Sequence, residues 1–278
     1  MTQIQIPAVT LADGVTIPQL GFGVFQIPPD DTAATVTKAF ELGYRHIDTA
    51  AIYRNEAGVG EALAATDLAR DELFITTKLW NAEQGYDTTL RAFDASMEKL
   101  GLDVLDLYLI HWPLPSRDKY VDTWKALVQL KEDGRIRSIG VSNFQPAHLR
   151  RLLDEVGVVP SVNQVELHPF LQQGPLRAVH AEHGIATEAW SPLAQGKVLD
   201  APVLTRIAAE HDKTAAQVVL RWHVDLGNVV IPKSVTPSRM AENLDIFDFS
   251  LSDAELAAVA GIDRAERIGF DPDTMDIG

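Results

Sequence analysis

The stretch Asp106-Leu-Tyr-Leu-Ile-His111 is a short strand-like run that ends in a polar, chemically reactive residue. The same pattern recurs along the chain, with the polar residue at the carboxyl end of each run. The other runs are His46-Ile-Asp48, Leu73-Phe-Ile-Thr-Thr-Lys78, Ser138-Ile-Gly-Val-Ser-Asn143, Val162-Asn-Gln164, Ile185-Ala-Thr-Glu-Ala-Trp-Ser191 and Val229-Val-Ile-Pro-Lys233. An open sheet would spread these ends along a line, whereas a closed barrel of parallel strands brings them to one mouth. The pattern therefore predicts a barrel with one polar site.

The segments between these runs have the features of helices. Apolar residues recur in steps of three and four, and glycines follow where a left-handed cap ends a helix without steric cost. The apolar series include Leu90, Phe93, Met97 and Leu100, and the glycines are Gly43, Gly101, Gly134, Gly157, Gly184 and Gly227. The run Gln19-Leu-Gly-Phe22 adds an eighth strand. We therefore predict an α/β fold, a (β/α)8 TIM barrel.

Both ends of the chain differ from this repeating pattern. Near the amino terminus, strand-like runs at 9–11 and 15–17 flank Asp13-Gly14, a pair favoured in hairpin turns. A last helix is expected at about 252–262, followed by an irregular tail from 263 to 278, which is rich in Asp and Gly.

Composition limits the possible functions. A chain of 278 residues without a linker suits a single barrel domain over 1–278. The net charge of −15 disfavours nucleic acid and anionic membranes as partners. The absence of cysteine excludes disulfides and thiolate chemistry, and no metal site is predicted. Met1–Pro7 lacks the pattern of a secretion signal. We expect a monomeric cytoplasmic protein.

Four residues on or next to three consecutive strand ends can act together on a carbonyl oxygen. The phenol of Tyr53 ordinarily ionises at about pKa 10, too high for an efficient proton donor unless a nearby cation favours the phenolate. Lys78 can be that cation, Asp48 can keep Lys78 charged, and His111 can hydrogen-bond the substrate oxygen. Each residue alone is more often structural, but the grouping favours a catalytic site.

Reduction of a carbonyl also needs a hydride source. The chain has no Gly-x-Gly-x-x-Gly after a strand, so a Rossmann domain is not expected. Ser142, Asn143 and Gln164 instead offer amide-type donors and acceptors that suit a carboxamide. Trp190 offers an aromatic face on which a nicotinamide ring can stack.

A cluster of positive charge follows the last strand of this acidic chain, in Ile231-Pro-Lys233-Ser-Val-Thr-Pro-Ser-Arg239-Met-Ala-Glu242-Asn243. It combines Lys233 and Arg239 with a predicted helix start, and a helix amino end with such cations can bind a phosphate. A solvated charged loop is the alternative.

Over nearly its whole length the chain resembles the aldo-keto reductases, and it is most similar to the bacterial 2,5-diketo-D-gluconate reductase group. The motifs that carry the resemblance are Gly43-Tyr-Arg-His-Ile-Asp-Thr-Ala50, Leu107-Tyr-Leu-Ile-His-Trp-Pro113, Ile139-Gly-Val-Ser-Asn-Phe144, Asn163-Gln-Val-Glu-Leu-His-Pro169, Glu188-Ala-Trp190 and Ile231-Pro-Lys-Ser234. The resemblance implies a TIM barrel whose amino-terminal hairpin closes the bottom and which binds NADP(H) without a Rossmann fold.

The resemblance also implies a role for each matching residue. Tyr53 is the general acid of a catalytic tetrad with Asp48, Lys78 and His111. The residues implied for NADPH/NADP+ are Gly23, Val24, Asp48, Ser142, Asn143, Gln164, Trp190, Ser191, Leu193, Gly196, Lys233, Ser234, Val235, Arg239, Glu242 and Asn243. Among them, Lys233, Ser234 and Arg239 hold the 2′-phosphate. The residues implied for the carbonyl substrate are Phe25, Ile52, Trp80, His111 and Trp112.

Two departures from many members of the family bear on the substrate. Trp190 replaces a tyrosine, and both the loop after His111 and the tail are short. A shallow aromatic pocket with broad specificity is therefore expected, with the tail bordering only the substrate half of the site. The alternatives are a Schiff-base aldolase built on Lys78 and a non-enzymatic NADP-binding sensor.

Overall fold

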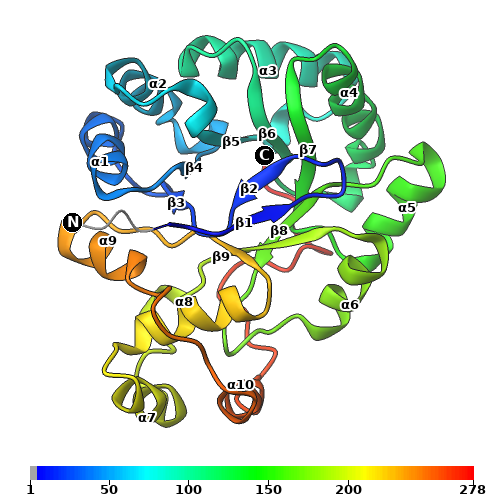
Figure 1. Cartoon of the computed structure of the whole chain (residues 1–278). Coiled ribbons are helices and arrows are strands. Elements are labelled where there is room, and N and C mark those ends of the chain that lie inside the picture. The colour runs from blue at the N-terminus through cyan, green and yellow to red at the C-terminus, as the bar shows by residue number, and fades with distance from the viewer. Residues whose placement is uncertain (1–4) are drawn as a thin grey trace.

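The centre of the computed structural model, which describes residues 5–278, is a closed barrel of eight parallel strands (Figure 1). The strands lie in chain order, and the barrel closes where Gly21 N donates to Val230 O and Val230 N donates to Gln19 O, each at 2.9 Å. The strands are β3 (Phe22–Gly23), β4 (His46–Asp48), β5 (Phe74–Leu79), β6 (Leu105–Ile110), β7 (Ile136–Ser142), β8 (Val162–Glu166), β9 (Ala186–Trp190) and β10 (Val229–Val230). The prediction of a (β/α)8 barrel is confirmed.

The strand bounds differ most from prediction at the two ends of the sheet. The last run was expected to be extended to Lys233, but β10 ends at Val230. Ile231 N still donates to Ala189 O at 3.3 Å, whereas Pro232 has no N–H with which to continue the ladder. At the other end, β3 is only two residues long.

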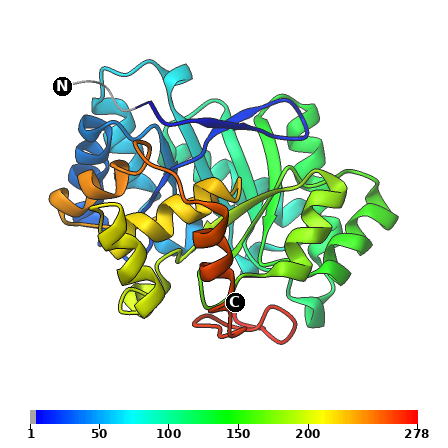
Figure 2. The ribbon, with the colours of Figure 1, turned by 60° about the horizontal axis from the view of Figure 1, so that its bottom comes forward.

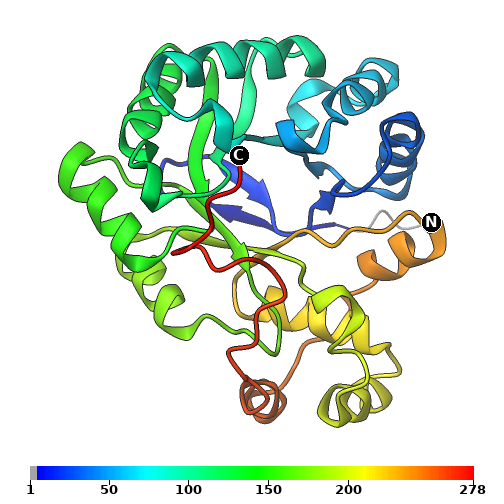
Figure 3. The ribbon, with the colours of Figure 1, turned by 180° about the vertical axis from the view of Figure 1, so that it is seen from behind.

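Helices surround the barrel on its outer side (Figure 3). They are α1 (Pro29–Leu42), α2 (Glu56–Ala65), α3 (Tyr86–Leu100), α4 (Tyr120–Glu132), α5 (Pro146–Val156), α6 (Gly174–His183), α7 (Pro202–Glu210), α8 (Ala215–Asp225), α9 (Pro237–Leu244) and α10 (Asp253–Ala260). The predicted apolar face of α3 packs inward, because Phe93 and Met97 are buried in the main core. Gly43 ends α1 with φ 114°, a left-handed conformation that glycine adopts readily. None of the helices described is both long and apolar enough to cross a membrane.

An antiparallel hairpin covers the amino-terminal end of the barrel (Figure 2). It consists of β1 (Ala8–Thr10) and β2 (Thr16–Pro18), one residue away from the predicted bounds. Leu11 and Ile17 from the hairpin are buried with barrel residues Phe74, Leu107, Leu109, Val162 and Val229. The expected closure of the barrel bottom is therefore confirmed for the described residues. Part of the segment 1–7, for which no secretion signal was expected, lies outside them, since the described residues begin at 5.

The tail from 263 to 278 crosses the opposite end of the barrel without a helix or strand, as expected (Figure 2). Its course is fixed by side chains far away in sequence. The buried carboxylate of Glu166 accepts from Ile268 N at 2.7 Å and from Gly269 N at 2.9 Å. Farther along the tail, Arg117 Nε donates to Asp276 Oδ1 at 2.6 Å, and Asn81 Nδ2 donates to Ile277 O at 2.5 Å.

Candidate active site

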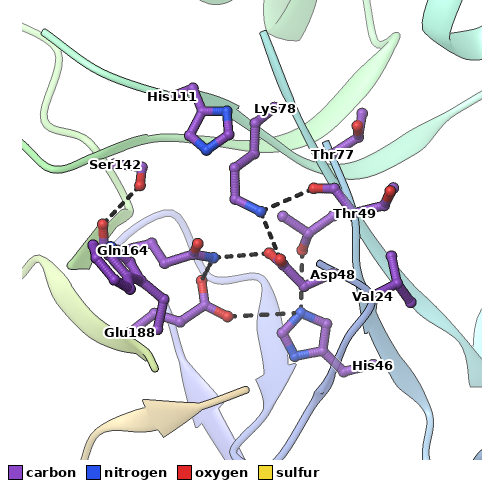
Figure 4. Close-up of polar contacts among 12 residues, drawn as sticks. Val24, His46, Asp48, Thr49, Thr77, Lys78, His111, Ser142, Gln164 and Glu188 are labelled. Carbon is purple, nitrogen blue, oxygen red and sulfur yellow. Dashed lines mark hydrogen bonds and ion pairs between the residues drawn. The ribbon is translucent and has the colours of Figure 1, made fainter. Parts of the chain in front are cut away.

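Side chains from consecutive strand ends meet at the end of the barrel opposite the hairpin (Figure 4). Asp48 is the last residue of β4, Lys78 lies near the end of β5, and His111 follows β6 directly. Ser142 ends β7, and Gln164 lies in β8. Because the strands are parallel and in chain order, residues separated by more than a hundred positions become neighbours.

Lys78 is held by two acceptors from β4 and the residue after it. Its Nζ donates to Asp48 Oδ1 at 2.5 Å and to Thr49 O at 2.9 Å. The same nitrogen lies 5.2 Å from the centroid of the Tyr53 ring. Tyr53 ends the 3-10 turn Ala51–Tyr53 just after β4. The structure thus places the proposed acid next to a buried, paired cation.

The charges in this group follow from burial and from the close ion pair. Burial lowers the pKa of Lys78, but Asp48 and Tyr53 raise it, and the net direction is upward. Lys78 therefore stays charged. Burial raises the pKa of Tyr53 more than the charge of Lys78 lowers it. The predicted influence of Lys78 on the phenol is present, but it is the smaller of the two, so Tyr53 keeps its proton at neutral pH.

His111 lies beside this group as a neutral imidazole. Burial and the nearby charge of Lys78 hold its pKa well below the ordinary value. Its ring centroid is 5.9 Å from that of Tyr53 and 5.6 Å from that of Trp80, both edge to face. Its Nδ1 has no hydrogen-bond partner within residues 5–278. A neutral ring in this place can donate a hydrogen bond to a substrate oxygen.

The residues expected to bind the carboxamide of the cofactor form hydrogen bonds mostly with one another and with their neighbours. Ser142 Oγ donates to Gln164 O at 2.8 Å. Asn143 Nδ2 donates to His111 O at 2.9 Å and to Ser142 Oγ at 3.1 Å, while Asn143 Oδ1 accepts from Trp190 Nε1 at 2.8 Å. Gln164 differs, because no hydrogen bond from the described residues ends on its Oε1. That oxygen is the amide acceptor left for a ligand.

These residues line a cavity of about 440 Å³ at the barrel mouth. Its wall includes every residue expected to contact the substrate: Phe25, Ile52, Trp80, His111 and Trp112. The tail adds Ile268, Phe270, Met275 and Ile277, which were not predicted. The tail also lies close to Trp190, because a Cβ built on Gly269 would lie 2.5 Å from Trp190 Cη2. The expectation that the tail borders only the substrate half stays a prediction.

A second cavity of about 750 Å³ adjoins the first, with Ser191 and Lys233 in the walls of both. It is lined by the other residues expected to bind the far part of the cofactor: Leu193, Gly196, Ser234, Val235, Arg239, Glu242 and Asn243. Gly23 lines the first cavity. Val24 lines neither, because its side chain is buried in the main core.

Glu188 of β9 is a buried member of the site for which no role was predicted. Its Oε2 accepts from Gln164 Nε2 at 2.9 Å, and its Oε1 lies 3.8 Å from His46 Nε2 (Figure 4). Burial and the charge of Asp48 raise the pKa of Glu188 to about 8, although Gln164 and Lys78 act against them. Alternation along β9 could have revealed it, since Glu188 and Trp190 point to the same side.

The raised pKa of Glu188 predicts how stability changes with pH. A carboxyl group with an ordinary pKa of 4.5 and a folded pKa of about 8 holds its proton longer in the folded chain. Its contribution to the free energy of unfolding is therefore full below pH 4.5 and is lost as the pH rises toward 8.

In the Glu188→Gln variant this loss should be absent. The ratio of the wild-type to the variant unfolding constant should rise by up to about tenfold per pH unit in that window. Urea denaturation across the window tests this, and a constant ratio would contradict it.

Comparison with known proteins identifies the family. The family model for the aldo/keto reductases matches residues 19–264. An aldo-keto reductase of Mycolicibacterium smegmatis is 58% identical over 270 residues, covering 97% of this chain and 98% of the relative. The methylglyoxal reductase DkgA of Escherichia coli K12 is 53% identical over 267 residues, covering 95% and 96%. The chain belongs to the aldo/keto reductase family and is an oxidoreductase, as the sequence predicted.

Solved structures agree with this assignment. A mutant of Gox0644, whose crystal structure is in complex with NADPH, is 52% identical in sequence to this chain. The two structures match with a TM-score of 0.95, covering 98% of this chain and 100% of that chain. The aldo/keto reductase from Brucella melitensis is 56% identical, with a TM-score of 0.91 over 93% and 100%.

Proposed function

We propose that this enzyme reduces aldehydes and ketones with NADPH, and that Tyr53 donates the proton. The observation that carries this proposal is the Tyr53 ring beside the Lys78–Asp48 pair. Tyr53 protonates the carbonyl oxygen, the charge of Lys78 stabilises the phenolate that remains, and His111 hydrogen-bonds the same oxygen. NADPH, when bound, supplies the hydride for the carbonyl carbon.

The residues present fit NADPH. The adjoining cavities offer an extended path from Gln164 to α9. At the near end, Gln164 Oε1 is a free acceptor for a carboxamide N–H, and Trp190 offers a ring face. At the far end, Lys233 and Arg239 are exposed and pair with no acidic group within residues 5–278. Unpaired cations in a chain with net charge −15 suit the 2′-phosphate, which Ser234 can also bind.

The substrate class follows from the wall of the first cavity. The part of this wall formed by Phe25, Ile52, Trp80, Trp112 and the tail is largely apolar and aromatic. Tyr53 and His111 are the polar groups suited to a carbonyl oxygen, and other polar residues of the wall, such as Gln164 and Lys233, are those expected to bind the cofactor. Such a wall admits aromatic aldehydes and small reactive dicarbonyls. Methylglyoxal, named in relatives such as DkgA, is the first small substrate to test, followed by 2,5-diketo-D-gluconate.

The alternatives predict different behaviour. An aldolase on Lys78 requires a neutral amine, whereas its pairing with Asp48 favours the ammonium form. A sensor would bind NADPH without turnover. Titration with NADPH, followed by a screen of carbonyls for loss of nicotinamide absorbance, tests the proposal. Borohydride trapping of a substrate on Lys78 would favour the aldolase, and binding without turnover would favour the sensor.

The place of the tail in the cavity wall leads to a prediction about substrate size. Phe270 is 57% exposed, and its ring centroid lies 6.4 Å from that of Trp112. The Phe270→Ala variant should raise KM for nitrobenzaldehyde about threefold to tenfold, the value of one aromatic contact. KM for methylglyoxal should stay nearly constant, because a small substrate need not reach the tail. Steady-state kinetics with both substrates checks this, and equal changes would exclude a selective role for Phe270.

The expected monomer, its cytoplasmic location and the absence of nucleic-acid and membrane partners stay predictions. Light scattering on the purified full chain, at several concentrations, tests the oligomeric state.

A further inference from the structure

Gln164 is held by carboxyl groups on both sides of its side-chain amide. Its Nε2 donates to Asp48 Oδ2 at 2.8 Å and to Glu188 Oε2 at 2.9 Å (Figure 4). All three side chains are buried in the barrel. We propose that Glu188 is a positioning residue, which orients the amide of Gln164 so that Oε1 accepts the carboxamide N–H of the cofactor. This inference rests on the proposed function of Gln164 as a nicotinamide contact.

The orientation follows from the number of donors and acceptors. An amide nitrogen has two hydrogens, and here each has one acceptor, on β4 and on β9. The flipped amide would place Gln164 Oε1 against two acceptor oxygens. With Asp48 as the only acceptor, the amide would be free to rotate about that single bond. Glu188 therefore removes the remaining freedom.

The backbone of Gln164 is fixed independently. Its carbonyl oxygen accepts from Ser142 Oγ at 2.8 Å and from Asn143 N at 2.9 Å. Of its polar side-chain atoms, only Oε1 has no hydrogen bond from residues 5–278. A cofactor carboxamide offers the N–H that this acceptor lacks, whereas an acetyl group offers a methyl. The orientation set by Glu188 thus favours binding of a cofactor carboxamide over an acetyl group in the same position.

The groups facing Glu188 explain why a glutamine can replace it. His46, Asp48 and Lys78 are the titratable neighbours. His46 is neutral, because burial lowers its pKa to about 3. Glu188 Oε1 has no hydrogen-bond partner within residues 5–278 and lies 3.8 Å from His46 Nε2, so a proton on Oε1 leaves Oε2 as the acceptor for Gln164. A glutamine side chain likewise presents one acceptor oxygen and one N–H donor group. Methionine has a similar length but no comparable acceptor.

Binding of three probes separates positioning from a structural role. The probes are NADP+, its 3-acetylpyridine analogue, which lacks the amide N–H, and 2′,5′-ADP, which lacks the nicotinamide half. Glu188→Met should weaken NADP+ binding about fivefold, the value of one net hydrogen bond. The same variant should bind the other two probes as the wild type does. Glu188→Gln should stay within about twofold of the wild type for all three.

A second variant and a double variant complete the design. Glu188→Thr, whose side chain is too short to reach Gln164, should show the same selective loss and serves if Glu188→Met does not fold. In a Gln164→Leu background, Glu188→Met should cause no further loss, because the two residues act as a unit.

The outcomes distinguish this inference from the proposed function. Equal weakening of all three probes, or wild-type NADP+ binding by Glu188→Met and Glu188→Thr, would overturn the role of Glu188 while leaving NADPH-dependent reduction intact. Failure of the wild type itself to bind NADP+ would overturn both.

Discussion

The Tyr53→Phe variant is expected to lose at least about 100-fold in kcat for carbonyl reduction, the usual cost of removing a positioned acid. Only the hydroxyl group is removed. The ring still packs against Phe25, with centroids 5.0 Å apart, and against His111, with centroids 5.9 Å apart. NADPH affinity, measured by fluorescence titration, should therefore stay near the wild-type value.

A matched control separates loss of the acid from general damage. Tyr86 is 39% exposed at the start of α3 and lines neither cavity, so Tyr86→Phe should leave kcat unchanged. Substantial turnover by Tyr53→Phe, with normal NADPH binding, would place the proton on another residue. His111 would then be the first candidate, although its lowered pKa keeps the ring in the neutral form, which is a much weaker acid than the imidazolium form.

The barrel could be predicted because its determinants are local and repeated. Each strand end carries its polar residue in a short segment such as His46–Asp48, which has the bounds that were predicted. The helix ends are signalled by glycines such as Gly43. Barrel closure then follows from geometry and needs no long-range information.

The residues below the strand ends were missed although the same alternation encodes them. In a strand, residues two apart point to the same side, so His46 lies below Asp48, and Glu188 lies below Trp190. Together with Thr76, whose Oγ1 is 3.1 Å from His46 Nε2, His46 and Glu188 form a buried polar layer beneath the site. Side chains at the tip of each strand can reach a ligand, and only these were predicted to belong to the site.

The path of the tail had no comparable signal. It has no periodic pattern, and its position depends on single contacts with remote elements, such as Glu166 with Ile268 and Gly269. These pairs are 102 and 103 residues apart. A composition rich in Asp and Gly indicated irregular structure but gave no information on the surface that the tail covers. The only indication that it lies against another surface was its set of large apolar residues, Ile268, Phe270, Met275 and Ile277.

Arg239→Ala is expected to weaken NADPH binding by about tenfold or more and to change NADH binding little. Arg239 lies in α9 and lines the second cavity with Lys233. A charge-assisted contact with a phosphate dianion contributes about 1.5–3 kcal/mol. NADH lacks the 2′-phosphate, so it has no such contact to lose. Dissociation constants for both cofactors, measured at one fixed salt concentration, give the comparison.

The control for this variant is another exposed arginine. Arg150 of α5 is absent from the walls of both cavities, so Arg150→Ala should leave both affinities unchanged while removing the same net charge. If Arg239→Ala weakened NADPH and NADH equally, Arg239 would support α9 and would not recognise the phosphate. A selective loss that shrinks at high salt would instead show a direct charge interaction, because the screening length for exposed charges falls from about 10 Å at 0.1 M to about 3 Å at 1 M ionic strength.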